Sequence, residues 1–284
     1  MREAAQPTPT QPTQLSFTAI ELLHSCPRQF WYQYLARYPS HQSTSDALTA
    51  ERAARPDAVG REQALALGVA VHQVLERLHA DFQDRAATFP EALAALEPGA
   101  ATLGPEQRGL AEGMLREYLA GPTAALPTVA TEFAFNWAEW SGPRCPPLVG
   151  VIDRIARLPS GELLIIDYKT NATLSAAELA DYSRQLQLYA AAVAAGVMGV
   201  PLRAPVTALA MLRAGELIGV PSGPSERQEA LSWAASSARR VEVGNYRSVE
   251  DFPDRPCGEC PFVERCPERR PEAAPTLFGQ LEEA

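Results

Sequence analysis

Three successive strand patterns between residues 128 and 170 limit the fold of this 284-residue chain more than any other feature. Alternation of apolar and polar residues predicts a strand over residues 128–137, and apolar runs predict strands over 148–158 and 162–170. The turn Pro159-Ser160-Gly161 between the last two runs is typical of a β-hairpin. The sequence therefore predicts a sheet built around this hairpin.

Helical periodicity surrounds these strands. It predicts two short helices over residues 17–38, broken at Pro27, a long helix over 61–87, and one or two helices over 90–119. Later segments predict helices over 175–195 and 225–243, with a second strand pair over 205–213 and 216–220. We therefore expect an α/β fold with a mixed central β-sheet flanked by helices and an N-terminal helical part.

One domain is expected over residues 15–270, with a helical insertion at about 39–125 that includes a polar loop over 40–57. Residues 1–14 are expected to form a disordered tail and 271–284 a C-terminal tail. No apolar run approaches the ~20 residues that span a bilayer. The N-terminus does not resemble a secretory signal, so no membrane partner and a cytoplasmic location are expected.

The strand predicted over residues 162–170 ends in side chains that carry chemistry. Asp167 and Lys169 are two residues apart, so they project from one face. Asp153 stands at the end of an apolar stretch in the preceding strand, and the hairpin brings the two strands side by side, so Asp153 can lie near Asp167. Two carboxylates can bind one Mg²⁺, and the lysine can orient a water or stabilise charge on a phosphate. The plain alternative for so short a motif is a surface ion pair.

Two further segments supply candidate residues. His72 follows Gly68 on the helix predicted over 61–87. Gln185 and Tyr189 are four residues apart, so they share a helix face and can contact a sugar–phosphate backbone. Each of these residues, taken alone, is also compatible with an ordinary helix surface.

Taken in this order, the segments resemble the RecB-like branch of the PD-(D/E)XK nuclease superfamily. The resemblance implies a restriction-endonuclease-like core and a DNA nuclease that depends on Mg²⁺ or Mn²⁺. It implies that the metal ligands are His72, Asp153, Asp167 and the Tyr168 carbonyl. It further implies Lys169, with Asp167 and Asp153, as catalytic, Gln185 and Tyr189 as DNA-binding, and Glu132 at a position where some members carry an acidic residue.

Three of the five cysteines, Cys257, Cys260 and Cys266, lie within ten residues of one another. An odd number of cysteines in a chain without a secretory signal does not suit a disulfide framework. A metal needs a fourth ligand, and Cys26 is the candidate. Four thiolates suit either a tetrahedral Zn²⁺ or a [4Fe–4S] cluster, and their spacing does not decide between the two.

The segment Cys26-Pro27-Arg28-Gln29-Phe30, together with the C-terminal cysteine loop, resembles the AddB-type iron–sulfur nucleases and the CRISPR-associated iron–sulfur exonucleases. That resemblance implies a structural [4Fe–4S] cluster on Cys26, Cys257, Cys260 and Cys266 that joins the two ends of the chain. Cys145 matches no ligand position and is expected to be a free thiol.

The function expected from these resemblances is an exonuclease acting on single-stranded DNA, or on duplex ends, in DNA repair and recombination. The net charge of −9 opposes non-specific coating of DNA, although only a local groove needs to be positive. The alternatives are a nuclease of CRISPR spacer acquisition, a non-catalytic DNA-binding scaffold that partners a helicase, and a zinc-ribbon interaction protein.

Overall fold

The computed structural model describes residues 11–36, 56–83, 85–100, 103–200, 202–247, 257 and 260–267. The C-terminal tail predicted over 271–284 lies outside these residues, as do most of the loop predicted over 40–57 and most of the N-terminal tail. Residues 11–14, at the end of that N-terminal tail, form no helix or strand.

The central sheet within the described residues has six strands. They are β1 (Leu15–Ser16), β2 (Thr128–Trp137), β3 (Leu148–Arg157), β4 (Leu163–Lys169), β5 (Val206–Met211) and β6 (Glu216–Val220). The β3–β4 and β5–β6 pairs are antiparallel, as their turns predict, whereas β4 and β5 are parallel. β2 pairs antiparallel with β3, and β1 pairs parallel with the start of β3. The prediction of a mixed sheet is confirmed.

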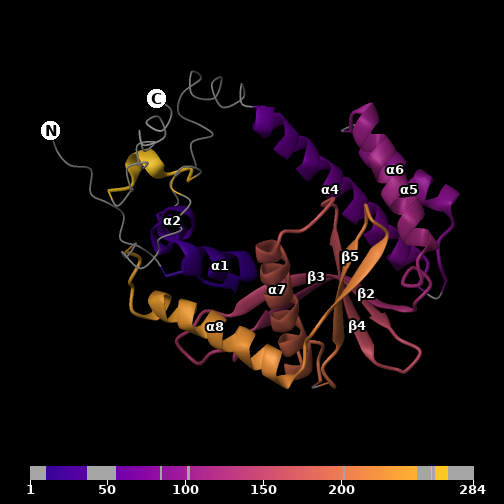
Figure 1. Ribbon diagram of the computed structural model, residues 1–284. Coiled ribbons are helices and arrows are strands. Elements are labelled where there is room, and N and C mark those ends of the chain that lie inside the picture. The colour runs from indigo at the N-terminus through magenta and orange to yellow at the C-terminus, as the bar shows by residue number, and fades with distance from the viewer. Residues whose placement is uncertain are drawn as a thin grey trace, which may run out of the picture.

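Helices cover both faces of this sheet (Figure 1). They are α1 (Phe17–Ser25), α2 (Pro27–Phe30), a π-helical turn η1 (Trp31–Leu35), α4 (Pro56–Asp81), α5 (Phe89–Ala100), α6 (Pro105–Ala120), α7 (Ala176–Ala195), α8 (Pro224–Glu242) and a 3₁₀ turn η3 (Val263–Arg265). α4, α5 and α6 lie on one face, and α1, α7 and α8 lie on the other (Figure 1). In the described part of the chain, no helix combines the length and apolar character that crossing a membrane requires.

Local sequence signals explain most helix ends. Pro27 breaks the first helical segment as predicted, and the Cys26 sulfur accepts a hydrogen bond from the backbone N–H of Gln29. Ser175 begins α7 with a reciprocal capping box to Glu178. The predicted helix over 61–87 was wrong at both ends, since α4 begins at residue 56 and ends at Asp81. It ends there because the chain turns toward β2, where the Gln83 carbonyl accepts a hydrogen bond from Thr128.

Side chains of β4 alternate between two apolar cores. Leu163 and Ile165 pack with the α1, α7 and α8 side, whereas Leu164 and Ile166 pack with α4, α5 and α6. Complete burial of one such side chain stabilises the fold by about 1.5–3 kcal/mol. A strand held on both faces is a rigid support, and its last residues, including Lys169, begin the candidate site.

Candidate metal centre

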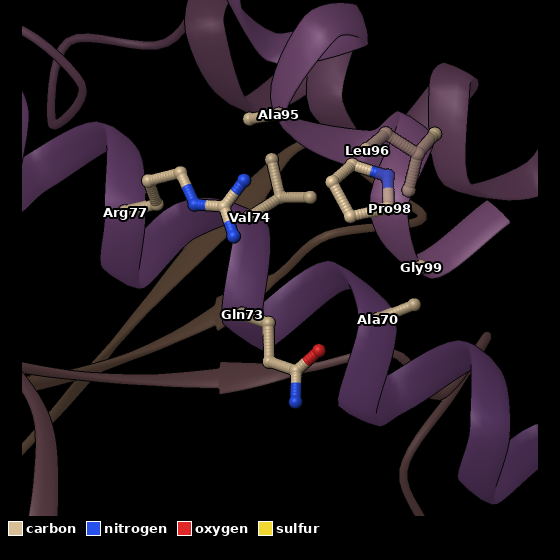
Figure 2. Close-up of a pocket in the computed structure, with 8 residues that line it drawn as sticks. All are labelled: Ala70, Gln73, Val74, Arg77, Ala95, Leu96, Pro98 and Gly99. Atoms are coloured by element: carbon tan, nitrogen blue, oxygen red, sulfur yellow. The ribbon is translucent and has the colours of Figure 1, made fainter.

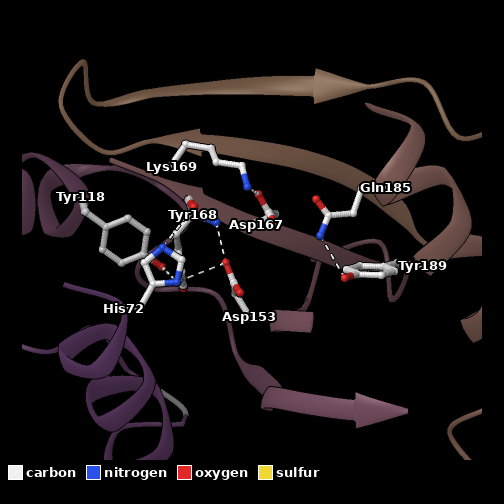
Figure 3. A network of polar contacts seen from close by, with 8 residues as sticks. All are labelled: His72, Tyr118, Asp153, Asp167, Tyr168, Lys169, Gln185 and Tyr189. Atoms are coloured by element: carbon white, nitrogen blue, oxygen red, sulfur yellow. Dashed lines mark hydrogen bonds and ion pairs between the residues drawn. The ribbon is translucent and has the colours of Figure 1, made fainter. Parts of the chain in front are cut away.

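β3 and β4 separate where the predicted carboxylates lie. Their backbone pairing extends to Arg154 opposite Ile166 and stops there, while β4 stays paired with β5 as far as Lys169. At the next position, Asp153 Oδ2 accepts a hydrogen bond of 2.8 Å from the backbone N–H of Tyr168. The side chain thus replaces the missing backbone bond, and Asp153 lies in the fork between the strands (Figure 3).

Three potential ligands meet at this fork. Single ligand atoms of His72, Glu132 and Asp153 lie within 4.8 Å of one another. His72 comes from α4, and its Nε2 is 3.1 Å from the Tyr168 carbonyl oxygen (Figure 3). The tautomer that donates to this carbonyl leaves the Nδ1 lone pair 3.7 Å from Asp153 Oδ2. Imidazole and carboxylate groups so arranged fit a divalent cation such as Mn²⁺ or Mg²⁺.

Glu132 reaches this site through a strained backbone. Its φ of 43° is the only positive value among the non-glycine residues that the structure describes. The residue lies in β2 between two pairs with β3, Thr131 with Arg154 and Phe133 with Ile152, which places it opposite Asp153. Left-handed backbone at such a residue costs about 1–3 kcal/mol and is found mostly at functional sites. Nothing in the sequence reveals this conformation, and Glu132 was expected only through the resemblance, at a position where some members carry an acidic residue.

The metal-free site carries unbalanced negative charge. Burial, followed by the charge of Asp167, raises the pKa of Asp153 to about 7. Burial and then the charges of Asp153 and Glu76 raise the pKa of Glu132. Burial lowers the pKa of His72, which keeps its imidazole neutral and able to bind a cation. Without a metal, these carboxylates reduce their mutual repulsion by taking up a proton. A bound divalent cation would relieve the same repulsion.

The raised pKa of Asp153 predicts that the metal-free protein loses stability as the pH rises. The folded carboxyl keeps its proton up to about pH 7, whereas the unfolded one loses it near 3.8. The folded state binds more protons in that window, so unfolding free energy falls between about pH 4 and pH 7. We expect the change in melting temperature from pH 5 to pH 8, measured with a chelator, to be less favourable in the parent than in Asp153→Asn, and Mg²⁺ to raise the parent's value at pH 8.

Asp153→Asn is the control for this expectation, because asparagine can still accept the hydrogen bond from Tyr168 but does not titrate. The lowered pKa values of His72, His79 and His24 act in the opposite direction and are common to both proteins. The difference between the two plots of melting temperature against pH therefore gives the contribution of Asp153 alone. An identical pH dependence in parent and Asp153→Asn would contradict the expectation.

Asp167 and Lys169 form a buried pair beside the ligands. Lys169 Nζ lies 2.7 Å from Asp167 Oδ2, and the ammonium also sits 3.9 Å from the centre of the Tyr182 ring. Within the described residues, this ion pair is the contact made by Asp167 Oδ2, which accepts no hydrogen bond there. The same-face arrangement predicted for these two residues is present.

Gln185 and Tyr189 lie on the Asp167 side of the site (Figure 3). The Gln185 amide donates a hydrogen bond of 2.9 Å to the Tyr189 hydroxyl. The Tyr189 side chain is 5% exposed, and its burial raises the pKa of the phenol to about 12. Tyr189 therefore holds the half-buried Gln185 amide in place, and Gln185 is the better placed of the two to contact a substrate.

Gly150 explains how the Tyr189 ring comes so close to β3. A Cβ at this position would lie 2.7 Å from both the Tyr189 and the Phe135 rings. Gly150→Ala is expected to displace Tyr189 and to destabilise the protein by about 1–3 kcal/mol, as overpacking does. Thermal unfolding beside Gly219→Ala tests this, because a Cβ at Gly219 in β6 meets nothing within 4 Å. Equal stability of the two variants would contradict the prediction.

A buried polar network supports the site from the α6 side, and sequence reasoning missed it. Arg154 is fully buried and donates to Tyr118 Oη at 2.7 Å and to the Thr123 carbonyl at 2.8 Å. Tyr118 Oη is in turn 3.1 Å from the hydroxyl of Tyr168, whose backbone contacts both His72 and Asp153. Nothing marks Arg154 in the sequence as a buried rather than a surface arginine.

Two hollows border α4. The larger, about 540 Å³, contains the metal ligands His72, Glu132 and Asp153 and extends along the helix. The smaller, about 120 Å³, lies between α4 and α5 and is lined in part by Gln73 and Arg77 (Figure 2). Gln73 lines both hollows. The smaller hollow has no carboxylate or imidazole in its lining, so the cation site lies in the larger cleft.

The cysteines predicted to bind a cluster lie together at the ends of the chain. The pKa of the Cys260 thiol is raised first by burial and then by its neighbours Cys26, Cys266 and Cys257. None of the four forms a disulfide within the part of the chain that the structure describes. The C-terminal segment is fixed against the N-terminal helices by Tyr32. The Tyr32 hydroxyl donates a hydrogen bond of 2.8 Å to the Arg265 carbonyl, and the Tyr32 ring stacks on Phe262.

The fifth cysteine behaves differently. Cys145 is buried in the core that includes residues of α1, α7 and α8, and burial raises the pKa of its thiol to about 11. Cys145 is not among the cysteines whose charges raise the pKa of Cys260. Its environment suits the free thiol expected from the sequence.

Comparison with known proteins gives one family. The model of the PD-(D/E)XK nuclease superfamily matches residues 14–267. No curated protein matches the chain. A solved structure titled "Crystal structure of SSO0001" is similar at 14% identity and a TM-score of 0.43, covering 92% of this chain and 89% of that one. At that identity and TM-score, the likeness establishes neither fold nor function.

Proposed function

The chain belongs to the PD-(D/E)XK nuclease superfamily, and on that premise we propose that it is a deoxyribonuclease dependent on Mg²⁺ or Mn²⁺. The observation that carries the proposal is the meeting, at the fork between β3 and β4, of a three-ligand group with a lysine–carboxylate pair. A surface ion pair, the plain alternative for Asp167 and Lys169, would be solvated, whereas their side chains are 9% and 16% exposed.

Each residue at the fork has a distinct role in this proposal. His72, Glu132 and Asp153 would hold the cation, and Asp167 and the Tyr168 carbonyl are proposed as further ligands. When bound, the cation supplies polarisation of the scissile phosphate and a more acidic water. Lys169 stabilises the charge that develops on the phosphate, or orients the attacking water, from its place beside Asp167.

The four clustered cysteines are proposed to hold a [4Fe–4S] centre. Cys26, Cys257 and Cys266 are close enough to Cys260 to raise the pKa of its thiol. Four thiols grouped in this way form a suitable ligand set for a cluster or for zinc. The surrounding contacts join the first helices to the segment that contains Phe262 and Arg265, so the proposed role of the centre is structural. Spectroscopy separates the two metals, because an iron–sulfur protein is brown and a zinc protein is colourless.

The proposed reaction is exonucleolytic cleavage at single-stranded DNA ends during repair and recombination. Gln185, held by Tyr189, is proposed to contact the sugar–phosphate backbone beside the scissile bond. A chain that bound DNA without cutting it would instead serve as a scaffold for a helicase. The buried Lys169–Asp167 pair favours the catalytic role over that one.

Digestion of end-labelled DNA tests the proposal. Single-stranded and duplex oligonucleotides are incubated with the protein and Mn²⁺ or Mg²⁺, with a chelator and with Asp167→Ala in parallel. Release of short labelled products that requires the cation and is lost in Asp167→Ala supports the proposal. Absence of cleavage of every DNA end by metal-loaded, anaerobically purified protein would refute it.

A further inference from the structure

Three exposed apolar side chains line the same cleft as the metal ligands. Leu65, Val69 and Val151 are 70%, 48% and 45% exposed, and all three border the hollow that contains His72 and Asp153. Exposed apolar residues are common singly, but a group of them beside a reactive centre marks a contact surface. We call Leu65, Val69 and Val151 the apolar wall.

Helix geometry extends the wall away from the metal. Leu65 and Val69 precede His72 by seven and three residues, which places all three on one face of α4. The lining continues to Glu76, so it follows the helix for about 16 Å at 1.5 Å per residue. Nucleotides stacked in a strand advance about 3.4 Å each, so several fit along this length. A strand that has a phosphate at the metal ligands and follows α4 would therefore pass the apolar wall.

The charges in the cleft disfavour a substrate that presents phosphates to its walls. Glu76, Glu132 and Asp153 are acidic, and none of the described residues that line the cleft is arginine or lysine. Neutralisation of phosphates by basic residues normally supplies most of the non-specific affinity for DNA. In a duplex, the phosphates lie outside and the bases are stacked within, so a duplex offers the apolar wall little. An unpaired strand exposes its base faces.

We propose that the apolar wall contacts the unpaired bases of the strand being cut, so that this cleft selects its substrate by exposed bases rather than by phosphate contacts. The proposal rests on the proposed nuclease function and adds to it the surface that recognises the substrate. Leu65 and Val69 meet bases one to two helical turns from His72, and Val151 meets a base beside Asp153.

Equilibrium binding with matched strands tests this contact. Fluorescence anisotropy is measured in the Lys169→Ala background, which slows cutting, with a thymidine strand and with a strand of equal length that lacks bases. The double variant Leu65→Asn, Val69→Thr removes apolar groups with little change in size. It should weaken binding of the thymidine strand roughly tenfold, or about 1.4 kcal/mol, and leave the baseless strand unaffected.

The control is the double variant Leu110→Asn, Val206→Thr, which changes exposed apolar residues on α6 and β5. It should bind both strands like the parent. If the wall variant binds the thymidine strand with parental affinity while the parent cuts DNA, the apolar wall has another partner and the inference alone is wrong. If the parent neither binds nor cuts any strand, the proposed function itself fails, and the inference falls with it.

Discussion

Lys169→Ala is expected to reduce the rate of DNA cleavage by about 10²–10³, the usual cost of losing one positioned charge at a transition state. Lys169 is close to Asp167 but is not part of the group of His72, Glu132 and Asp153. The variant should therefore keep its affinity for Mn²⁺ and for DNA, and should keep the brown colour of a cluster. Single-turnover cleavage, together with metal and DNA titrations, measures the three properties separately.

The composition of the chain provides an unusual control for this prediction. Lys169 is the only lysine in the sequence, and the other 24 of its 25 lysine and arginine residues are arginine. An amine-directed acetylating reagent can therefore modify only this side chain and the N-terminal amine. Acetylation should inactivate the parent and have no further effect on Lys169→Ala.

Lys169→Arg is expected to be inactive as well, because the planar guanidinium cannot take the place of a compact ammonium between Asp167 and Tyr182. Arg203→Ala is the matched surface control, since Arg203 pairs with Glu162 at the other end of β4 and is 83% exposed. Parental cleavage by Lys169→Ala would show that the lysine has no part in catalysis.

Cys26→Ala is expected to lose most of its iron and to unfold at a lower temperature, because metal binding and folding are coupled. Anaerobically purified parent should contain about four irons per chain. A bond closing a loop of roughly 230 residues restrains the unfolded chain by about 5 kcal/mol in the chain-entropy picture developed for disulfides. For a protein of this size, the melting temperature should fall by about 10 °C or more.

Cys145→Ala is the matched control, because Cys145 is as buried as Cys26 and its replacement leaves a similar cavity. Iron content and absorbance near 400 nm should be normal in this variant. Equal iron content and equal melting temperature in Cys26→Ala and the parent would remove Cys26 from the ligand set. Stoichiometric zinc without iron in the parent would replace the cluster by a zinc site.

The sequence predicted the sheet well because its central strands carry local signals. The apolar run ending in Asp167 and the turn at Gly161 defined the hairpin of β3 and β4. The two-residue strand β1 was missed, since Leu15 and Ser16 are too few to show a period and pair with residues 133 positions away. Local patterns cannot reveal such a pairing.

The site shows a similar division. Same-face spacing predicted the Asp167–Lys169 pair, but the fork that admits Asp153 arises from where the pairing of β3 and β4 stops. The backbone strain of Glu132 and the burial of Arg154 depend on packing between distant segments. Residue type and spacing carry no trace of either.

The contacts between the two ends of the chain have a consequence for its synthesis. Phe17 packs against Trp233 of α8, and Tyr32 contacts Phe262 and Arg265. At about 5–20 residues per second, a ribosome makes Tyr32 roughly 10–50 s before Arg265. Throughout that interval the apolar residues of α1 and α2 leave the exit tunnel ahead of their partners. This nascent segment is where a chaperone would bind, and where a stalled or truncated product would first aggregate.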